Sequence, residues 1–348
     1  MTAPPAGRGS DGRKGRHRPG GEELAVPPAE FRSYYGRAVL RAPVWKYDIP
    51  AYLFTGGLAA GSSLVAAGAD LTGRPVLRRA ARAASLGAVG ASTYFLINDL
   101  GRPERFYNML RVAKPTSPMS MGTWILAAFG PAAGIAAVAE LAGALPNRGV
   151  LGLARRLLPS AGRAAGLAAA VAAPALATYT AVLLADTAVP SWHEARRVLP
   201  FAFAGSALAS GAGAGLIGAP VSETAPLRRL AVAGAALELA AVHAAENDLG
   251  LLSEPYQTGR PGRLLRLART LTAAGAIGAV AGRRSRILSI LSGAALLGGS
   301  LATRFGVYEA GVASAKDPKY TVVPQRARLA AGRPAGAAPK DTGAHQQG

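Results

Sequence analysis

The sequence predicts an all-α integral membrane protein whose eight transmembrane helices form two four-helix bundles related by a parallel internal repeat. Of the 348 residues, 50% are hydrophobic and only 17% are charged, whereas a soluble chain carries about 25% charged residues. The charges gather in the tails and in short segments, and several Ala-, Leu- and Gly-rich runs between them are long enough to cross a bilayer. We therefore expect a multi-pass protein of the cell membrane, in contact with lipid.

Eight apolar runs define the predicted spans. In chain order they cover about 49–69, 83–98, 121–141, 164–185, 199–219, 230–247, 267–280 and 287–301. The last two are short and share an Arg-rich connection at 282–286. An even number of spans places both termini on one side of the membrane. Basic residues flank both ends of the spans, so the positive-inside rule leaves the orientation open.

An internal repeat divides the chain. The sequence Asn-Asp-Leu-Gly occurs at 98–101 and again at 247–250, and the same offset aligns Gly56 with Gly205 and Arg79 with Arg228. This offset equals four predicted spans, as in the parallel duplications of other membrane proteins. We expect one half at 43–186 and the other at 187–310. Residues 1–42 are expected to be a disordered or partner-contacting tail, and 311–348 a largely disordered one.

Composition argues against several functions. Cysteine is absent, so the chain has no disulfide, no thiolate-held iron–sulfur cluster and no covalent haem. Of the four histidines, His17 and His345 lie in the tails, which leaves His193 and His243 in different segments. A haem with two histidine ligands is therefore not expected, nor is a metal site. The net charge is +20, but the basic residues flank apolar spans and do not form one basic face. No nucleic acid is therefore expected as a partner.

Polar residues inside or beside spans are the candidate functional groups, because they are costly in a membrane. Asp48 and Tyr52 are four residues apart at the start of the first span and share a helix face. They could bind a buried carbonyl and handle its proton, or act as a helix cap and an interfacial anchor. Tyr179 interrupts the fourth span. Its hydroxyl could donate to a quinone oxygen or join two helices.

The end of the second span is polar. Asn98 and Asp99 precede Arg102 and Arg105. The segment is either a helix exit held by Asp–Arg pairs, or a surface that docks an acidic partner and forms one wall of a ligand site.

Two further groups lie in the second half of the chain. Trp192, His193 and Glu194 occupy the connection after the fourth span, on the same side of the membrane as Asp48 and Asp99. Together these residues would form one polar site at the membrane surface, which we call the mouth. The sixth span carries three more polar residues, which form either a proton-conducting stripe or a satisfied network between helices: Glu238, His243 and Glu246.

Three segments carry a family resemblance. Trp45 with residues 48–61, then 99–103 and 117–122, resemble in order the motifs of the NrfD/PsrC family, the polysulfide-reductase-type membrane subunits. The resemblance implies a haem-free eight-helix anchor that binds menaquinone or ubiquinone. By position it assigns the quinone to Asp48, Tyr52 and Tyr179, although Asp48 and Tyr52 are not the side chains of the best-known relatives. It also implies a docked ferredoxin-like iron–sulfur subunit and a molybdopterin catalytic subunit that contains molybdenum or tungsten.

The sequence thus favours a quinone-binding subunit of an oxidoreductase complex that has no catalytic residue of its own. Asn98, Asp99, His193, Glu194 and the polar residues of the sixth span would relay protons. Arg102, Arg105 and Trp192 would dock the partner. Family members serve polysulfide, nitrite, tetrathionate and formate dehydrogenase systems, and nothing in the sequence selects one. Two alternatives are a secondary transporter with duplicated halves and a purely structural anchor.

Overall fold

The computed structural model describes residues 38–43 and 45–331, and the regular elements of this part of the chain are all helices. Eight of its helices have 20 residues or more. They are α1 (Asp48–Leu71), α2 (Pro75–Asn98), α3 (Pro118–Val138), α4 (Gly149–Ala185), α6 (Leu199–Gly218), α7 (Ala225–Asp248), α9 (Gly259–Ala281) and α10 (Arg286–Lys316). Short elements connect them: η2 (Pro103–Leu110), η3 (Ala139–Ala144), α5 (Pro190–Glu194), η4 (Ala195–Arg197), η5 (Val221–Glu223), η6 (Gly250–Ser253) and α8 (Glu254–Gln257), and α11 (Lys319–Ala331) follows the last long helix.

Six helical segments of the described chain are long and apolar enough to cross a membrane. They are α1, α3 together with η3, α4, α6, α9 and α10. Helices α2 and α7 are of similar length but carry arginines near their starts. These are Arg78, Arg79 and Arg82 in α2, and Arg228 and Arg229 in α7. The prediction of an all-helical membrane protein is confirmed. The predicted spans at 83–98 and 230–247 are helical but are not among the six.

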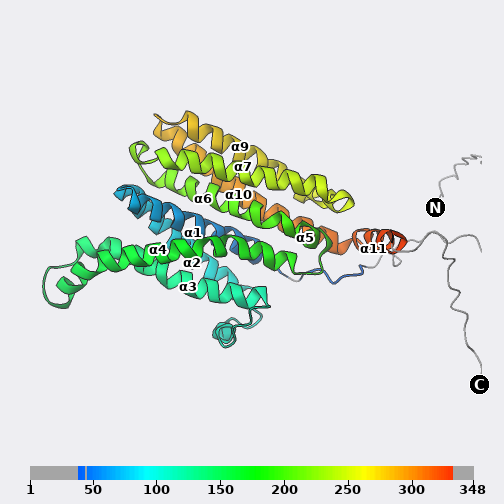
Figure 1. The fold of residues 1–348 in the computed structure, drawn as a ribbon, viewed down its shortest axis with the longest axis horizontal. Coiled ribbons are helices and arrows are strands. Elements are labelled where there is room, and N and C mark those ends of the chain that lie inside the picture. The colour runs from blue at the N-terminus through cyan, green and yellow to red at the C-terminus, as the bar shows by residue number, and fades with distance from the viewer. Residues whose placement is uncertain (1–37, 44, 332–348) are drawn as a thin grey trace, which may run out of the picture.

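The long helices lie side by side in one elongated bundle (Figure 1). Helices α1 and α6 pack against each other through small residues. A β-carbon on Gly61 would lie 1.9 Å from the Ala207 carbonyl oxygen, and one on Gly211 would lie 2.3 Å from the Gly61 carbonyl carbon. Glycine is therefore needed at both positions for this close approach of the two backbones.

The C-terminal part of the chain corrects two predictions. The eighth predicted span ends at 301, whereas α10 continues to Lys316. The segment 311–348 was expected to be largely disordered, yet residues 311–316 complete α10 and Lys319–Ala331 form α11. The apolar run stops in sequence at Arg304, but this arginine is fully buried and the helix continues past it. Residues 38–42 are irregular, and the predicted tails at 1–37 and 332–348 lie outside the described residues.

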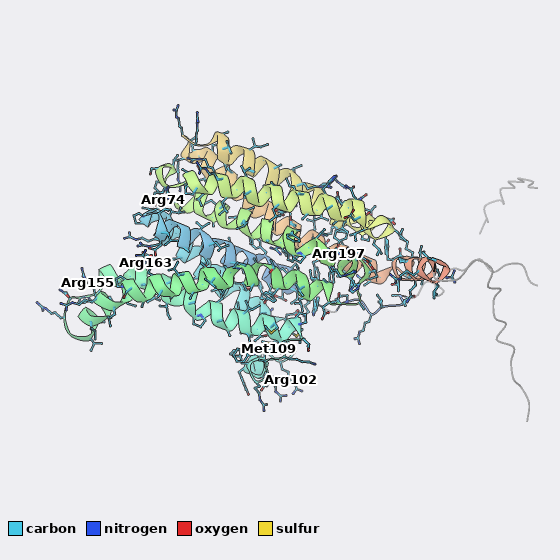
Figure 2. All side chains as sticks on the ribbon, viewed as in Figure 1. Arg74, Arg102, Met109, Arg155, Arg163 and Arg197 are labelled. Carbon is cyan, nitrogen blue, oxygen red and sulfur yellow. The ribbon has the colours of Figure 1, made fainter. Side chains whose placement is uncertain are left out.

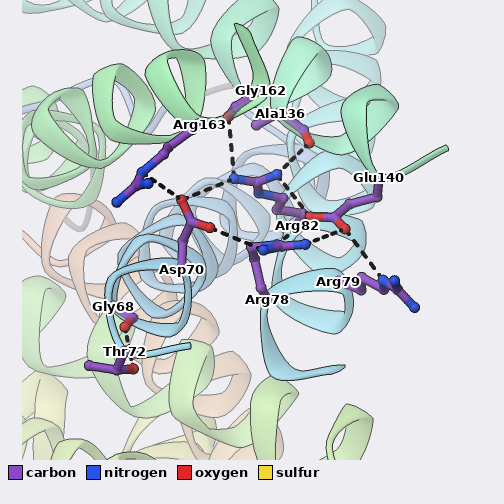
Figure 3. A network of polar contacts seen from close by, with 10 residues as sticks. All are labelled: Gly68, Asp70, Thr72, Arg78, Arg79, Arg82, Ala136, Glu140, Gly162 and Arg163. Atoms are coloured by element: carbon purple, nitrogen blue, oxygen red, sulfur yellow. Dashed lines mark hydrogen bonds and ion pairs between the residues drawn. The ribbon is translucent and has the colours of Figure 1, made fainter. Parts of the chain in front are cut away.

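A network of ion pairs closes the end of the bundle where α1 stops (Figure 3). Asp70 at the end of α1 lies 3.1 Å from Arg78, 3.8 Å from Arg82 and 3.7 Å from Arg163. Glu140 in η3 lies 2.7 Å from Arg78 and 2.8 Å from Arg82. This paired network, which also includes Arg79, joins α1, α2, η3 and α4. Sequence analysis did not single out either of its two acids.

Candidate functional site

The opposite end of α1 carries the first predicted site residue. Asp48 is buried in the first turn of α1, where a carboxylate interacts favourably with the positive end of the helix dipole. The N-cap is Tyr47, and no side-chain hydrogen bond caps the helix. Asp48 instead accepts a hydrogen bond of 3.0 Å from the Asn98 side-chain amide at the end of α2. The structure therefore brings together Asp48 and Asn98, which lie 50 residues apart in the chain.

A second carboxylate lies next to this pair. The backbone N–H of Lys46 faces the Asp99 carboxylate. Burial raises the pKa of Asp99 above its ordinary value, and the nearby Asp48 carboxylate raises this pKa further, while Lys46 partly offsets both effects. Asp48 thus lies close enough to Asp99 to act on its pKa, as expected for two acids at one polar mouth.

Tyr52 and Tyr179 meet one turn further into the bundle. Their rings pack edge to face, with the centroids 6.5 Å apart, and both side chains are buried. The Tyr179 hydroxyl is buried and has no hydrogen-bond partner, which is uncommon for a polar atom in a protein interior. Gly122 at the start of α3 makes room for this ring, because a β-carbon there would lie 2.2 Å from Tyr179 Cε2.

Trp192 lies in the core and not at the surface. Its side chain is 0% exposed, its ring stacks on Trp45 at 6.2 Å and packs against Tyr308 at 5.8 Å, and its indole N–H donates to the Val307 carbonyl over 2.8 Å. A buried ring offers no surface for a partner, so the predicted docking role is replaced by one in packing α5 against α10. The indole has found its hydrogen-bond partner inside the protein, as buried tryptophans usually do.

The two neighbours of Trp192 diverge. The His193 ring lies 3.0 Å from the Ala185 carbonyl oxygen, at the end of α4. Glu194 points outward and forms ion pairs with Arg196 at 3.5 Å and Arg328 at 3.6 Å. Within the described residues, neither side chain forms a hydrogen bond or an ion pair with Asp48 or Asp99.

The three polar residues of α7 do not form one continuous stripe. Glu238 is buried and accepts a hydrogen bond from Thr303 of α10. Glu246 pairs with Arg269 of α9 at 2.7 Å. His243 is exposed and contacts the Asn247 side chain at 3.0 Å. The predicted stripe is therefore divided between two separate pairs and a surface histidine.

Arg102 lies just before η2 and Arg105 lies within it, and this segment projects from the bundle (Figure 2). Both side chains are exposed. Within the described residues no ion pair joins Asp99 to either arginine, so the predicted Asp–Arg staple does not form. The two arginines remain available at the end of the bundle that carries Asp48.

One residue beside the mouth, Tyr308, was missed in the sequence. The hydroxyl of Tyr308 on α10 donates to the Trp45 carbonyl oxygen, just before α1 begins. Tyr308, Trp45 and Pro50 also line a surface cleft of about 630 Å³ next to Asp48. The predicted eighth span ended before Tyr308, so no sequence signal placed this residue near the mouth.

Together, these features describe a multi-pass helical membrane protein with a buried polar group at one end of its bundle. A family model described as "Polysulphide reductase, NrfD" matches residues 39–226. This range is more than half of the chain and contains Asp48, Tyr52, Asn98, Asp99 and Tyr179. The chain belongs to the NrfD family, and it is a membrane subunit of the polysulfide-reductase-like kind, which assembles with other respiratory subunits. No match was found among curated proteins.

Proposed function

We propose that this protein is the quinone- or quinol-binding membrane subunit of an oxidoreductase complex. The observation that supports this best is the unpartnered Tyr179 hydroxyl. The Tyr179 ring packs against Tyr52, which lies one turn after Asp48 on α1. A buried donor without a partner is costly, and a quinone oxygen would accept its hydrogen bond. Menaquinone and ubiquinone both present such an oxygen.

The surrounding residues suit the other requirements of quinone chemistry. Oxidation of a quinol releases two electrons and two protons. Asp48 and Asp99 can accept protons at the mouth, and the raised pKa of Asp99 favours its protonated form. The 348 residues contain no cysteine to hold a cluster, so the electrons would pass to an iron–sulfur subunit that delivers them to a molybdenum or tungsten enzyme.

The exposed η2 segment is the proposed docking surface. Arg102 and Arg105 extend from the same end of the bundle as Asp48, and Phe106 and Tyr107 beside them are 43% and 58% exposed. Arginines and exposed aromatic rings are enriched at protein interfaces. An iron–sulfur subunit docked here would lie near the quinone.

We also infer that the two halves are repeats. The hairpins α1–α2 and α6–α7 occupy corresponding stretches at the repeat offset, and each packs around its aligned glycine. A β-carbon on Gly56 would lie 3.4 Å from Ser92 Oγ on α2, and one on Gly205 would lie 2.4 Å from the Glu238 nitrogen on α7. Such duplication also occurs in transporters, and the buried Glu238 would suit one. Substrate-dependent ion flux through liposomes containing this chain alone would favour that alternative.

The proposal is tested by quinone-dependent turnover of the purified complex. The double variant Asp48→Ala with Tyr179→Phe should lose most of its turnover, because it removes both the hydroxyl donor and a mouth carboxylate. The matched control is Tyr94→Phe, which removes a hydroxyl from a tyrosine of α2 that is 63% exposed and should leave turnover unchanged. Full turnover in the double variant would contradict the proposal, because quinone would then react at other residues of the complex.

A further inference from the structure

A pair of opposite charges is buried away from the proposed quinone site. Arg304 on α10 is 0% exposed and Glu238 on α7 is 2% exposed. Arg304 Nη2 donates to the Phe203 carbonyl over 2.8 Å, and the guanidinium carbon lies 3.7 Å from the centre of the Phe203 ring. Thr303 donates its hydroxyl hydrogen to Glu238 Oε1. Charges at membrane depth are costly and usually mark function.

The hydrogen bonding of this pair is incomplete. Glu238 Oε2, Arg304 Nε and Arg304 Nη1 are all buried without a hydrogen-bond partner. The Ser206 hydroxyl faces Glu238 and lies 2.7 Å from the hydroxyl of Ser300. Such a set of donors and acceptors is suited to ordered water, through which a proton can move.

Helix α10 links the pair to the mouth. Tyr308 lies one turn beyond Arg304 on the same helix face, bonds to the Trp45 carbonyl and is within electrostatic range of Asp99. On its other side Arg304 lies against α1, where a β-carbon on Gly57 would be 2.9 Å from Arg304 Nη2. The guanidinium therefore lies beside the helix that carries Asp48 and Tyr52. We call Glu238, Arg304, Tyr308 and Asp99 the polar column.

We propose that Glu238 is a proton-transfer group that exchanges a proton with the quinone site along the polar column. The inference rests on the proposed function, in which quinol oxidation supplies protons and the electrons leave through the partner subunit. The Glu238 carboxylate takes up one proton to become a neutral carboxyl group and later releases it, without any change of oxidation state. Arg304 keeps its charge throughout and stabilises the carboxylate form. Arg304 would act as a positioning residue.

Infrared difference spectroscopy tests this proposal. The complex isolated through this chain would be measured with decylubiquinone, and the spectrum of the oxidised state subtracted from that of the reduced state. The wild type should show a carboxyl C=O band that is lost in Glu238→Gln. The matched control is Glu309→Gln, which alters a carboxylate of α10 paired with Arg260 at 3.3 Å, and it should retain the band. A Glu238→Gln spectrum identical to the wild type would overturn the proposal.

Two further variants cover the case in which Glu238→Gln does not assemble. Thr303→Val removes the hydroxyl donor of Glu238 but keeps both charges, and it should shift the carboxyl band. Thr303→Ser restores the donor and should restore the band. An unshifted band in Thr303→Val contradicts the proposal. Quinone turnover of the same samples distinguishes the two proposals. If Tyr179→Phe lowers turnover while the Glu238→Gln spectrum matches the wild type, the proton-transfer role of Glu238 is wrong and the proposed function stands.

Discussion

The two ends of helix α1 carry the same kind of side chain in opposite surroundings. At its C-terminal end, Asp70 is shared among Arg78, Arg82 and Arg163, and the network continues to Glu140. At its N-terminal end, Asp48 accepts one hydrogen bond from Asn98, and the nearby Tyr179 hydroxyl has no partner. One end is extensively paired and the other is partly unpaired.

This difference distinguishes a network that stabilises the fold from a site that could bind a ligand. Polar groups are found at both boundaries of the bundle, so their presence alone does not identify a site. In the paired network, removing one member leaves buried charges without a counter-charge. At the mouth, removing the unpartnered hydroxyl takes away nothing that the protein itself uses. Removal of a polar group should therefore lower stability in the paired network and quinone turnover at the mouth.

The largest effect is expected from Glu140→Ala in the paired network. The side chains of Arg82 and Arg78 are 7% and 28% exposed, and both would lose a carboxylate partner. Breaking a buried pair costs about 3–5 kcal/mol, so thermal unfolding in detergent should shift strongly downward. Glu194→Ala is the control, since its pairs are exposed and such pairs contribute about 0–1 kcal/mol. Equal losses in the two variants would contradict the distinction.

Gly122→Ala should damage the mouth through packing. The new methyl group would meet the Tyr179 ring, with Cε2 only 2.2 Å away, and overpacking of this kind costs about 1–3 kcal/mol. Displacement of the ring should also abolish most quinone turnover. Gly130→Ala on the same helix has nothing within 4 Å of its β-carbon. This control should keep full turnover and gain about 0.5–1 kcal/mol from higher helix propensity.

Tyr179→Phe should separate turnover from stability. Loss of one hydrogen bond to quinone is expected to lower turnover at limiting quinone about tenfold, which corresponds to about 1.4 kcal/mol. The free energy of unfolding should stay the same or rise, because the hydroxyl is unpartnered in the protein. Tyr256→Phe gives the reverse pattern. Its hydroxyl donates to the Ser191 carbonyl over 3.0 Å, so the variant should lose about 1 kcal/mol with normal turnover.

The smallest expected effect is a pH dependence at Asp99. Burial raises its folded-state pKa above the ordinary value of 3.8, so the folded protein holds this proton more tightly than the unfolded chain does. Stability therefore falls as pH rises from the unfolded pKa through the folded pKa. Asp99→Asn should remove that part of the dependence in thermal unfolding measured across the acidic range. An unchanged profile would mean that Asp99 titrates as it does in the unfolded chain.

The sequence predicted the helical segments well, because apolar runs of span length can hardly form anything else in a membrane. The family resemblance assigned Asp48, Tyr52 and Tyr179 to one site. The structure packs Tyr52 against Tyr179, and Asp48 lies one turn before Tyr52 on α1. The predicted end of the last span was wrong, because α10 continues to Lys316. Arg304 breaks the apolar run, and only the folded structure reveals that Glu238 and Phe203 compensate for its burial.

The missed network has a similar cause. In sequence, Asp70 and Glu140 read as ordinary charges at span ends, since their arginine partners come from different helices. Trp192 was expected to dock a partner from the connection after the fourth span. Its burial depends on Trp45 and Tyr308, which are distant in the chain. Local composition therefore indicates which segments are helical, but the pairing of polar groups depends on tertiary contacts.

The most direct test of the proposed function is quinone-analogue binding to the purified chain without partner subunits. Menadione affinity would be measured for the wild type, Tyr179→Phe and Tyr94→Phe, with Glu140→Gln as a variant of the paired network. We predict that Tyr179→Phe weakens binding, whereas the two other variants bind like the wild type once corrected for the folded fraction. Equal affinity for the wild type and Tyr179→Phe would contradict the assignment of the quinone site to the N-terminal end of α1.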